Sequence, residues 1–262
     1  MNALMTVLKR VKMYIAILVV GYLLICAVMY FMQRSLLYFP TQNVETSEAK
    51  ALYYEINGQR IKVWQLNSGK DKAILYFGGN AENVANNIDS YNRFFPDHTI
   101  YLVNYRGYSG SSGKPTEQGL FDDALAIYDQ IEQQHKNIAV FGRSLGSGVA
   151  VYLAVNKNID KLVLITPYDS VRAVAKTQYF WLPVNLLLLD HFDSHSRAAN
   201  VSVPTLVLRA QQDLIIPEKH TLNLIKRINS SLLKSAMIEG TTHNSIETKL
   251  DYFEHILTFL HD

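Results

Sequence analysis

The sequence predicts an α/β fold, a mostly parallel β-sheet flanked by helices, preceded by one transmembrane helix. Two observations support this prediction. From about residue 52 onward, strand-like apolar runs alternate with helical segments, a pattern typical of parallel sheets that helices cover on both faces. Before them, residues 13–32 form an uncharged apolar run that is long enough to cross a hydrocarbon core of ~30 Å as a helix.

The predicted strands and helices follow one another in regular alternation. We expect strands at residues 52–57, 61–66, 73–77, 99–104, 138–141, 161–166, 205–209 and 235–239. The later strands are continuous apolar runs, which is typical of strands that are buried on both faces of a sheet. We expect helices at residues 81–95, 116–134, 146–156, 217–228 and 249–260. In the second of these helices, apolar residues recur at three- and four-residue steps and form one apolar face.

By composition, the 262 residues divide into four parts. We expect a short basic tail at 1–12, the transmembrane helix at 13–32, a linker at 33–50 and one globular domain at 51–262, which is long enough to bury its own core. Within the domain, the insertion at about 167–203 separates two predicted strands, and we interpret it as a cap.

The basic residues are concentrated around the apolar run. Lys9, Arg10 and Lys12 precede it and Arg34 follows it, while the rest of the chain holds 21 basic residues (25 less these four) and 23 acidic ones. No basic stripe remains for nucleic acid, so we expect no nucleic-acid partner. By the positive-inside rule the N-terminus is cytoplasmic and the domain extracytoplasmic, which means periplasmic in a Gram-negative bacterium.

A cleaved signal peptide is the alternative interpretation of the apolar run. The apolar region of a signal peptide is usually ~7–15 residues long and is followed by a cleavage site of small residues. Here the run is longer, and residues 33–36 (QRSL) contain no such site. The sequence therefore favours an uncleaved anchor.

Cys26, the only cysteine, lies inside the apolar run, so no intramolecular disulfide is possible. We expect it to act as a small hydrophobic residue that faces lipid. The alternative is a lipidated cysteine, which the large preceding residue Ile25 disfavours.

The segment IAVFGRSLGSG contains the pattern G-x-S-x-G, with Ser144 between Gly142 and Gly146. An apolar strand precedes the pattern and a helix of small residues follows it, which is the context of a nucleophilic serine on a tight strand-to-helix turn. Glycines on both sides let strand and helix approach closely. Ser144 is therefore the predicted nucleophile.

A serine hydroxyl needs a base and an orienting acid to react. On folds that carry this motif, the acid and then the histidine follow the serine along the chain. Asp213 follows the strand at 205–209 and His243 follows the strand at 235–239, both at strand ends where ligands bind in open α/β sheets. Asp169 also follows a strand and is the alternative acid.

The oxyanion of an acyl-transfer intermediate needs two N–H donors. One is expected from Leu145, the residue after the nucleophile, and the other from the loop after the strand at 73–77. We choose the N–H of Asn80 in that loop, which reads GGNAEN.

These pieces together resemble the Bem46-like branch of the α/β-hydrolases, often grouped with serine-aminopeptidase-like hydrolases. The matching segments are FGGNAEN at 77–83, NYRGYSG at 104–110, GKPTE at 113–117 and GRSLGSG at 142–148, with the Asp213 and His243 loops. The resemblance covers about residues 50–262 and implies the α/β-hydrolase fold and the triad Ser144, Asp213 and His243. Relatives usually carry His where this chain has Gly78 and Gly where it has Glu82, so we expect a differently shaped oxyanion loop.

The sequence predicts a serine hydrolase that cleaves an acyl ester or thioester, lipid-like ones included, without a metal or an organic cofactor. The apolar stretches at 179–184 and 186–189 either pack the cap onto the domain or line an acyl pocket and touch the bilayer. Arg106 is expected to organise its loop, with binding of a substrate anion as the alternative. The alternative functions are a peptidase on the same triad and a non-catalytic, membrane-tethered binding protein. The oligomeric state is open.

Overall fold

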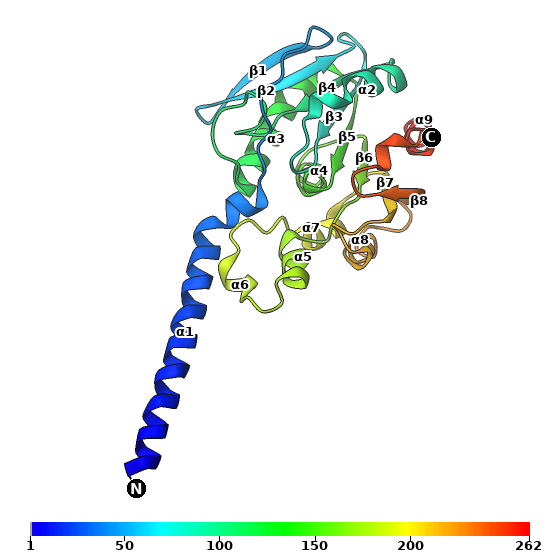
Figure 1. Cartoon of the computed structure of the whole chain (residues 1–262). Helices are drawn as coiled ribbons and strands as arrows, with labels where there is room; N and C mark the ends of the chain where they lie inside the picture. Colours follow the sequence, from blue (N-terminus) through cyan, green and yellow to red (C-terminus); the bar gives the residue numbers. More distant parts are fainter. Residues whose placement is uncertain (1) are drawn as a thin grey trace.

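The computed structural model describes residues 2–262, so Met1 of the predicted basic tail lies outside the described residues. The first element is α1 (Asn2–Leu37), a single helix that projects away from the rest of the molecule (Figure 1). It contains the predicted span at 13–32, and it also includes most of the predicted tail and the first residues of the predicted linker. Among the described residues, the stretch Leu4–Leu37 is the one helix long and apolar enough to cross a membrane.

Within residues 2–262, eight strands form one sheet, and each of the eight predicted strands is present with ends shifted by a few residues. The strands are β1 (Lys50–Ile56), β2 (Gln59–Leu66), β3 (Lys72–Phe77), β4 (His98–Val103), β5 (Asn137–Arg143), β6 (Lys161–Ile165), β7 (Thr205–Gln212) and β8 (Leu233–Thr242). Their order is β1-β2-β4-β3-β5-β6-β7-β8. Only the β1–β2 and β2–β4 pairs are antiparallel, so the sheet is mostly parallel, as predicted.

Helices cover both faces of the sheet. Apart from α1 and the helices between β6 and β7, the α-helices are α2 (Ile88–Phe94), α3 (Glu117–Ile131), α4 (Leu145–Asn156), α8 (Glu218–Ile225) and α9 (Leu250–His261). Four short 3₁₀ turns are η1 (Val84–Asn87), η2 (Glu132–Gln134), η3 (Ala198–Asn200) and η4 (Ile246–Thr248). The helix predicted at 81–95 begins later than expected, because Ala81 adopts a left-handed φ of 59° and η1 forms its first half.

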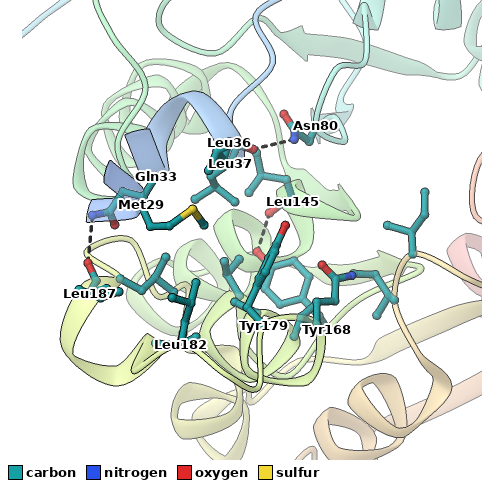
Figure 2. A pocket seen from close by; sticks show the side chains of 18 of the residues that line it. Met29, Gln33, Leu36, Leu37, Asn80, Leu145, Tyr168, Tyr179, Leu182 and Leu187 are labelled. Carbon is teal, nitrogen blue, oxygen red and sulfur yellow. Dashed lines mark hydrogen bonds between the residues drawn. The ribbon is translucent and has the colours of Figure 1, made fainter. Parts of the chain in front are cut away.

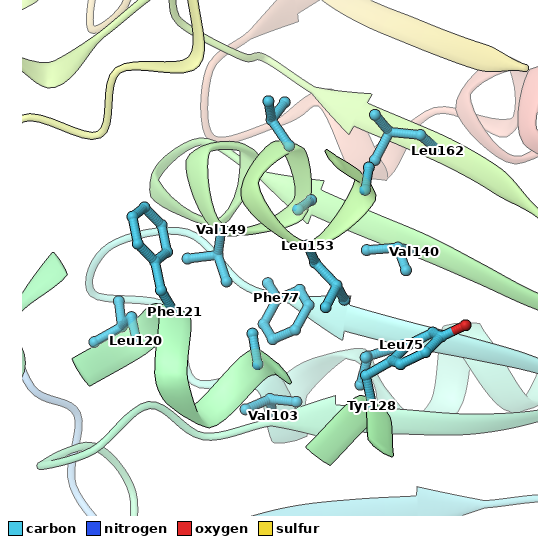
Figure 3. Close-up of a cluster of buried hydrophobic side chains, with 14 of the residues drawn as sticks. Leu75, Phe77, Val103, Leu120, Phe121, Tyr128, Val140, Val149, Leu153 and Leu162 are labelled. Atoms are coloured by element: carbon cyan, nitrogen blue, oxygen red, sulfur yellow. The ribbon is translucent and has the colours of Figure 1, made fainter. Parts of the chain in front are cut away.

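The core consists of two apolar clusters, one on each face of the sheet, and β3 shows how the sequence makes them. Its side chains point alternately to opposite faces. Leu75 and Phe77 join the cluster beneath α3 and α4 (Figure 3), whereas Ile74 and Tyr76 join the cluster beneath α2 and α9. A strand buried on both faces must be apolar throughout, which accounts for the continuous run AILYF.

The chain between β6 and β7, residues 166–204, is called the β6–β7 segment here. It holds three short helices, α5 (Val171–Gln178), α6 (Val184–Leu187) and α7 (Ser194–Arg197), and it lies beside the C-terminal half of α1 (Figure 1). Cys26 of α1 is buried, with 8% of its surface exposed, against Leu182 and Val184 of this segment. The expectation that Cys26 faces lipid is therefore wrong, because the β6–β7 segment covers that side of α1.

Candidate active site

Ser144 lies on the tight turn between β5 and α4. Its backbone angles are φ 47° and ψ −114°, a strained conformation that residues other than glycine seldom adopt. A Cβ atom on Gly146 would overlap the carbonyl oxygen of Phe77, and one on Gly142 would overlap that of Gly146. The two glycines of the motif are therefore required, because strand, turn and helix pass too close together for any side chain.

The structure brings the three predicted triad residues together. The His243 Nε2 atom lies 2.8 Å from Ser144 Oγ, and His243 Nδ1 lies 2.7 Å from Asp213 Oδ2. A neutral imidazole protonated on Nδ1 satisfies both contacts, because Nδ1–H then donates to the carboxylate and the serine hydroxyl donates to Nε2. Only 6% of the His243 side chain and 9% of the Asp213 side chain are exposed, so water competes little for these hydrogen bonds.

Local backbone geometry places Asp213 and His243 at the edge of the sheet. Asp213 directly follows β7, where an irregularity in the β7–β8 pairing falls between Ala210 and Gln212. Such bulges bend a strand and redirect the side chains that follow it. The second oxygen of Asp213 accepts hydrogen bonds from the N–H groups of Ile215 and Ile216, at 3.0 and 2.8 Å. The carboxylate is therefore held by its own loop while it faces His243.

Asp169, the alternative acid, does not contact His243. Its carboxylate accepts hydrogen bonds from His220 Nδ1 at 2.9 Å, from the Ser170 N–H at 2.7 Å and from Asn223 Nδ2 at 3.2 Å. The geometry therefore favours Asp213 over Asp169 as the partner of His243.

Leu145 and Asn80, the predicted oxyanion donors, both line the cavity next to Ser144. Leu145 is the first residue of α4, where N–H groups have no partner within the helix and the helix dipole favours negative charge. Within residues 2–262, the Asn80 N–H donates to no protein acceptor. Both donors are therefore available to a ligand.

The Asn80 side chain ties its loop to the chain that leaves α1. Its Nδ2 donates to the Leu37 carbonyl oxygen at 2.6 Å, and its Oδ1 accepts from the Phe39 N–H at 3.0 Å. The hydroxyl of Tyr108 also donates to Oδ1, at 2.9 Å. The end of α1 is thereby fixed to the loop beside the nucleophile.

A buried ionic network behind the triad was not predicted from the sequence. The Arg143 guanidinium pairs through Nη1 with Glu82 Oε2 and through Nε with Glu247 Oε1, both at 2.8 Å. Its Nη2 donates to the backbone carbonyl of His243 at 3.2 Å. Glu82 in turn accepts from the Gly79 N–H at 2.6 Å. Arg143 therefore connects the nucleophile turn, the oxyanion loop and the histidine loop.

The ionisation of this network follows from its burial. Burial lowers the pKa of Arg143, but the Glu82 and Glu247 carboxylates outweigh that effect and raise it above its usual range. Burial, and then the neighbouring Glu82 charge, raise the pKa of Glu247 to about 7, although Arg143 lowers it. The Glu247 carboxyl group therefore titrates near neutral pH.

The two departures at Gly78 and Glu82 are linked in space. A Cβ on Gly78 would lie 2.7 Å from Val84 Cγ1 and 3.2 Å from the carboxyl carbon of Glu82. A side chain at position 78 would therefore collide with the loop that holds Glu82. The sequence signals for the network were this pair of departures and the arginine inside the serine motif, and neither identifies the ion pairs by itself.

Arg106 forms a bidentate ion pair with Asp123 of α3. Its Nε and Nη2 atoms donate to the two carboxylate oxygens at 2.8 and 2.6 Å. The guanidinium thus fixes its own loop to α3, in agreement with the expected organising role.

A cavity of about 330 Å³ opens at Ser144, and among residues 2–262 no Asp, Glu, Lys or Arg lines it. One wall is formed by the end of α1 and the residues after it, and the opposite wall by the β6–β7 segment (Figure 2). The Tyr168 hydroxyl, on the floor of the cavity, donates to the Leu145 carbonyl oxygen at 3.0 Å. Within residues 2–262, no group of three or more His, Cys, Asp or Glu side chains is arranged to hold a metal ion.

Comparisons with known proteins agree with this fold. A family model described as "alpha/beta hydrolase fold" matches residues 72–194. An uncharacterized protein of Mycobacterium tuberculosis is 33% identical over 230 residues, which cover 82% of each chain. Alpha/beta hydrolase domain-containing protein 17B of Homo sapiens is 28% identical over 170 residues, which cover 62% of this chain and 56% of that protein.

Solved structures with little sequence identity share the architecture. The esterase Pf2001 of Pyrococcus furiosus superposes with a TM-score of 0.69 at 15% identity, covering 85% of this chain and 96% of that one. The esterase EaEST of Exiguobacterium antarcticum gives 0.66 at 15% identity, covering 81% and 100%. On the family match, the mycobacterial relative and the shared architecture, the chain belongs to the α/β-hydrolase superfamily, with distant homology to the Bem46-like proteins.

Proposed function

We propose that the protein is a serine hydrolase that cleaves an acyl ester or thioester through an acyl-enzyme. The observation that carries this proposal is the continuous chain of contacts from Ser144 Oγ through His243 to Asp213, at 2.8 and 2.7 Å. Ser144 lies on a strained turn at the mouth of an apolar cavity. That combination matches the arrangement by which a hydroxyl becomes a nucleophile.

In the first half of the reaction, Ser144 Oγ attacks the acyl carbonyl carbon while its proton passes to His243 Nε2. The Asp213 carboxylate accepts the hydrogen bond from His243 Nδ1–H throughout and stabilises the imidazolium. The N–H groups of Leu145 and Asn80 stabilise the negative oxygen of the tetrahedral intermediate. When the intermediate collapses, the bond to the alcohol or thiol breaks and His243 gives its proton to the leaving group.

In the second half, water attacks the acyl-enzyme carbonyl carbon and transfers a proton to His243. The bond to Ser144 Oγ then breaks, the proton returns to the serine and the carboxylic acid leaves. Because no charged residue lines the cavity, it suits a neutral acyl chain better than the charged amino terminus that an aminopeptidase must recognise.

We further propose that residues 13–32 anchor the protein in a membrane, that residues 51–262 form the hydrolase domain and that residues 167–203 are its cap. The N-terminus is then cytoplasmic, because Lys9, Arg10 and Lys12 precede the apolar run. Only Arg34 follows the run closely, and its Nε pairs with Asp190 of the β6–β7 segment at 3.0 Å. Protease protection in sealed vesicles of known sidedness tests this orientation.

The proposed activity is tested by fluorophosphonate labelling of the full-length protein. We expect labelling of the wild type, none of Ser144→Ala, and strongly reduced labelling of His243→Ala and Asp213→Asn. Asp169→Asn is the matched control, because this carboxylate bonds a different histidine, and we expect it to label like the wild type. Folded wild-type protein that does not label, or Ser144→Ala that still does, contradicts the proposal.

A further inference from the structure

The β6–β7 segment carries an exposed apolar surface, here called the apolar lobe and defined as residues 177–189. The sequence TQYFWLPVNLLLL contains no charged residue. Two of its apolar side chains are almost fully exposed, Phe180 at 85% and Leu186 at 82%. Large apolar side chains that are exposed together mark a surface that is covered in the working protein.

The apolar lobe is attached to the part of α1 that is predicted to lie in the membrane. The Tyr22 hydroxyl donates to the Trp181 carbonyl oxygen at 2.9 Å, and Gln33 Nε2 donates to that of Leu187 at 2.9 Å. The lobe therefore runs along residues 22–33 of α1, which overlap the predicted span at 13–32. At 1.5 Å per residue this contact is roughly 16 Å long, about half of a ~30 Å hydrocarbon core.

Several backbone groups of the apolar lobe are hydrogen-bonded, which lowers the free-energy cost of moving them away from water. Besides the two carbonyl groups held by α1, the Leu189 N–H donates to Gln33 Oε1 at 2.7 Å. Inside the lobe, the Leu182 N–H donates to the Tyr179 carbonyl and the Leu188 N–H donates to that of Val184, at 2.9 and 3.0 Å.

The cavity at Ser144 lies between the same two elements. Met29, Leu36 and Leu37 of α1 form one wall, and Leu182 and Leu187 of the apolar lobe face them (Figure 2). The helix proposed as the anchor is thus also a wall of the substrate site. An acyl chain beside α1 in the leaflet would need to move only along the helix to reach the nucleophile.

We infer that the apolar lobe is immersed in the leaflet beside α1, and that the cavity takes an acyl chain directly from that leaflet. The substrate is then an acyl ester or thioester dissolved in the membrane. This inference rests on the proposed hydrolase activity for its catalytic part, whereas the immersion of the lobe does not depend on it. The cavity of about 330 Å³ lies at the lower end of the range of ligand pockets, ~300–1,000 Å³.

Immersion of the lobe is tested by tryptophan fluorescence in phosphatidylcholine vesicles. The chain has two tryptophans, Trp181 in the lobe and Trp64, which is 1% exposed in the core. We expect phosphatidylcholine brominated along its acyl chains to quench the emission of the reconstituted wild type. The Trp181→Phe variant reports only Trp64 and should not be quenched. Wild-type emission that brominated lipid leaves unchanged overturns the inference, whatever the protein's activity.

The origin of the substrate is tested with one long-chain ester in phosphatidylcholine vesicles and one water-soluble short-chain ester. We expect the double variant Phe180→Asp/Leu186→Asp to lose about tenfold in rate on the vesicle ester, since charges oppose insertion. Its rate on the soluble ester should stay within about twofold, because neither side chain lines the cavity. Leu250→Asp, at a 62% exposed position on α9, is the control and should change neither rate.

The outcomes separate the two proposals. A wild type that hydrolyses neither ester contradicts the proposed function. The tryptophan fluorescence experiment then still tests whether the apolar lobe is immersed in the leaflet. Equal rates of the double variant and wild type on the vesicle ester overturn the inference, and so does an equal loss on both esters.

The role of α1 as a wall is tested with Leu36→Trp, which we expect to shift the preferred ester to shorter chains. Phe31→Trp is the control, because Phe31 is 83% exposed on the same helix and does not line the cavity. An unchanged chain-length preference in Leu36→Trp overturns the assigned wall.

Discussion

In the described part of the protein, two chains of contacts lead from an aspartate through a histidine to a hydroxyl group. In the first, Asp213 and His243 lead to Ser144. In the second, Asp169 lies 2.9 Å from His220 Nδ1, and His220 Nε2 lies 3.1 Å from Thr177 Oγ1. The distances are nearly the same, so distance alone does not explain why we assign catalysis to the first chain only.

The two hydroxyl protons have different acceptors available. Thr177 belongs to the last turn of α5, where its hydroxyl also donates to the Ala173 carbonyl oxygen at 3.2 Å. A hydroxyl has one proton, so this backbone acceptor competes with His220 for it. The Ser144 side chain makes no cap hydrogen bond to the first turn of α4, and His243 Nε2 lies 2.8 Å from its Oγ.

The surroundings of the two hydroxyl groups differ as well. Ser144 precedes the first turn of α4 and borders a cavity that Leu145 and Asn80, the proposed oxyanion donors, also line. Thr177 does not line that cavity. A nucleophilic hydroxyl therefore needs more than a base and an acid. It also needs a proton for which no backbone acceptor competes, oxyanion donors nearby and room for the substrate's carbonyl group.

The largest expected difference between the two chains concerns the hydroxyl groups themselves. Ser144→Ala should lower kcat/KM for a soluble ester by about 10⁴-fold or more, because the nucleophile is removed. Thr177→Ala should stay within about twofold, because its hydroxyl has no substrate beside it. Steady-state kinetics of both variants measure this. A Thr177→Ala variant as impaired as Ser144→Ala would break the distinction.

The two aspartates should separate activity from stability. Asp213→Asn should lower kcat by about 10³- to 10⁴-fold, because an amide no longer favours the Nδ1–H tautomer that leaves Nε2 free as the base. Asp169→Asn should leave kcat unchanged and lower the free energy of unfolding by about 1–3 kcal/mol. The reason is that three hydrogen-bond donors face the two carboxylate oxygens of Asp169, and an amide offers only one oxygen. Kinetics and thermal unfolding of both variants decide. Similar losses of kcat in Asp213→Asn and Asp169→Asn would mean that both chains of contacts contribute to catalysis.

Much of the proposed catalytic site could be predicted from the sequence, because each of its residues lies in a short, recognisable stretch of sequence. The G-x-S-x-G pattern places Ser144, and acid and histidine at the ends of later strands follow from the order of a parallel sheet. The eight strands were predictable for a similar reason, since apolar runs buried on both faces are continuous.

Contacts between distant parts of the chain were not predictable. The ion pairs of Arg143 join residues 61 and 104 positions away, and no local pattern indicates such a pairing. The wall that α1 contributes to the cavity was missed because an apolar helix reads as an anchor whether or not it packs on the domain. The Asp169–His220 pair was missed for the same reason, since it joins a loop to α8.

A substitution of Arg143 has a smaller expected effect on kcat, because Arg143 acts on the triad only through the residues that position Ser144 and His243. Lysine keeps the charge but cannot reach Glu82, Glu247 and the His243 carbonyl at once. We expect Arg143→Lys to lower kcat about tenfold with KM unchanged, and to lower the free energy of unfolding by about 1–2 kcal/mol. Asp169→Asn, which should lose stability without losing kcat, is the matched control. An Arg143→Lys variant that loses stability alone would show that the network does not position the triad.

The smallest expected effect concerns Glu247, which is linked to the contacts of Ser144 and His243 through Arg143. Its pKa is raised from an ordinary 4.5 to about 7 in the folded protein. Between these values the folded state binds more protons than the unfolded state, so this group's contribution to stability falls as pH rises. Glu247→Gln removes the titration.

We therefore expect the melting temperature of the wild type to fall relative to that of Glu247→Gln as the pH rises from about 4.5 to about 7. The Glu247 side chain is 24% exposed, so water weakens the effect. A difference of ~1 kcal/mol corresponds to about 2–4 °C for a domain of this size. Thermal unfolding across that pH range measures it, with Thr177→Ala, which should follow the wild type, as the control. Parallel curves for wild type and Glu247→Gln would mean that Glu247 stays ionised beside Arg143, and the network would then hold the histidine loop equally at acidic and neutral pH.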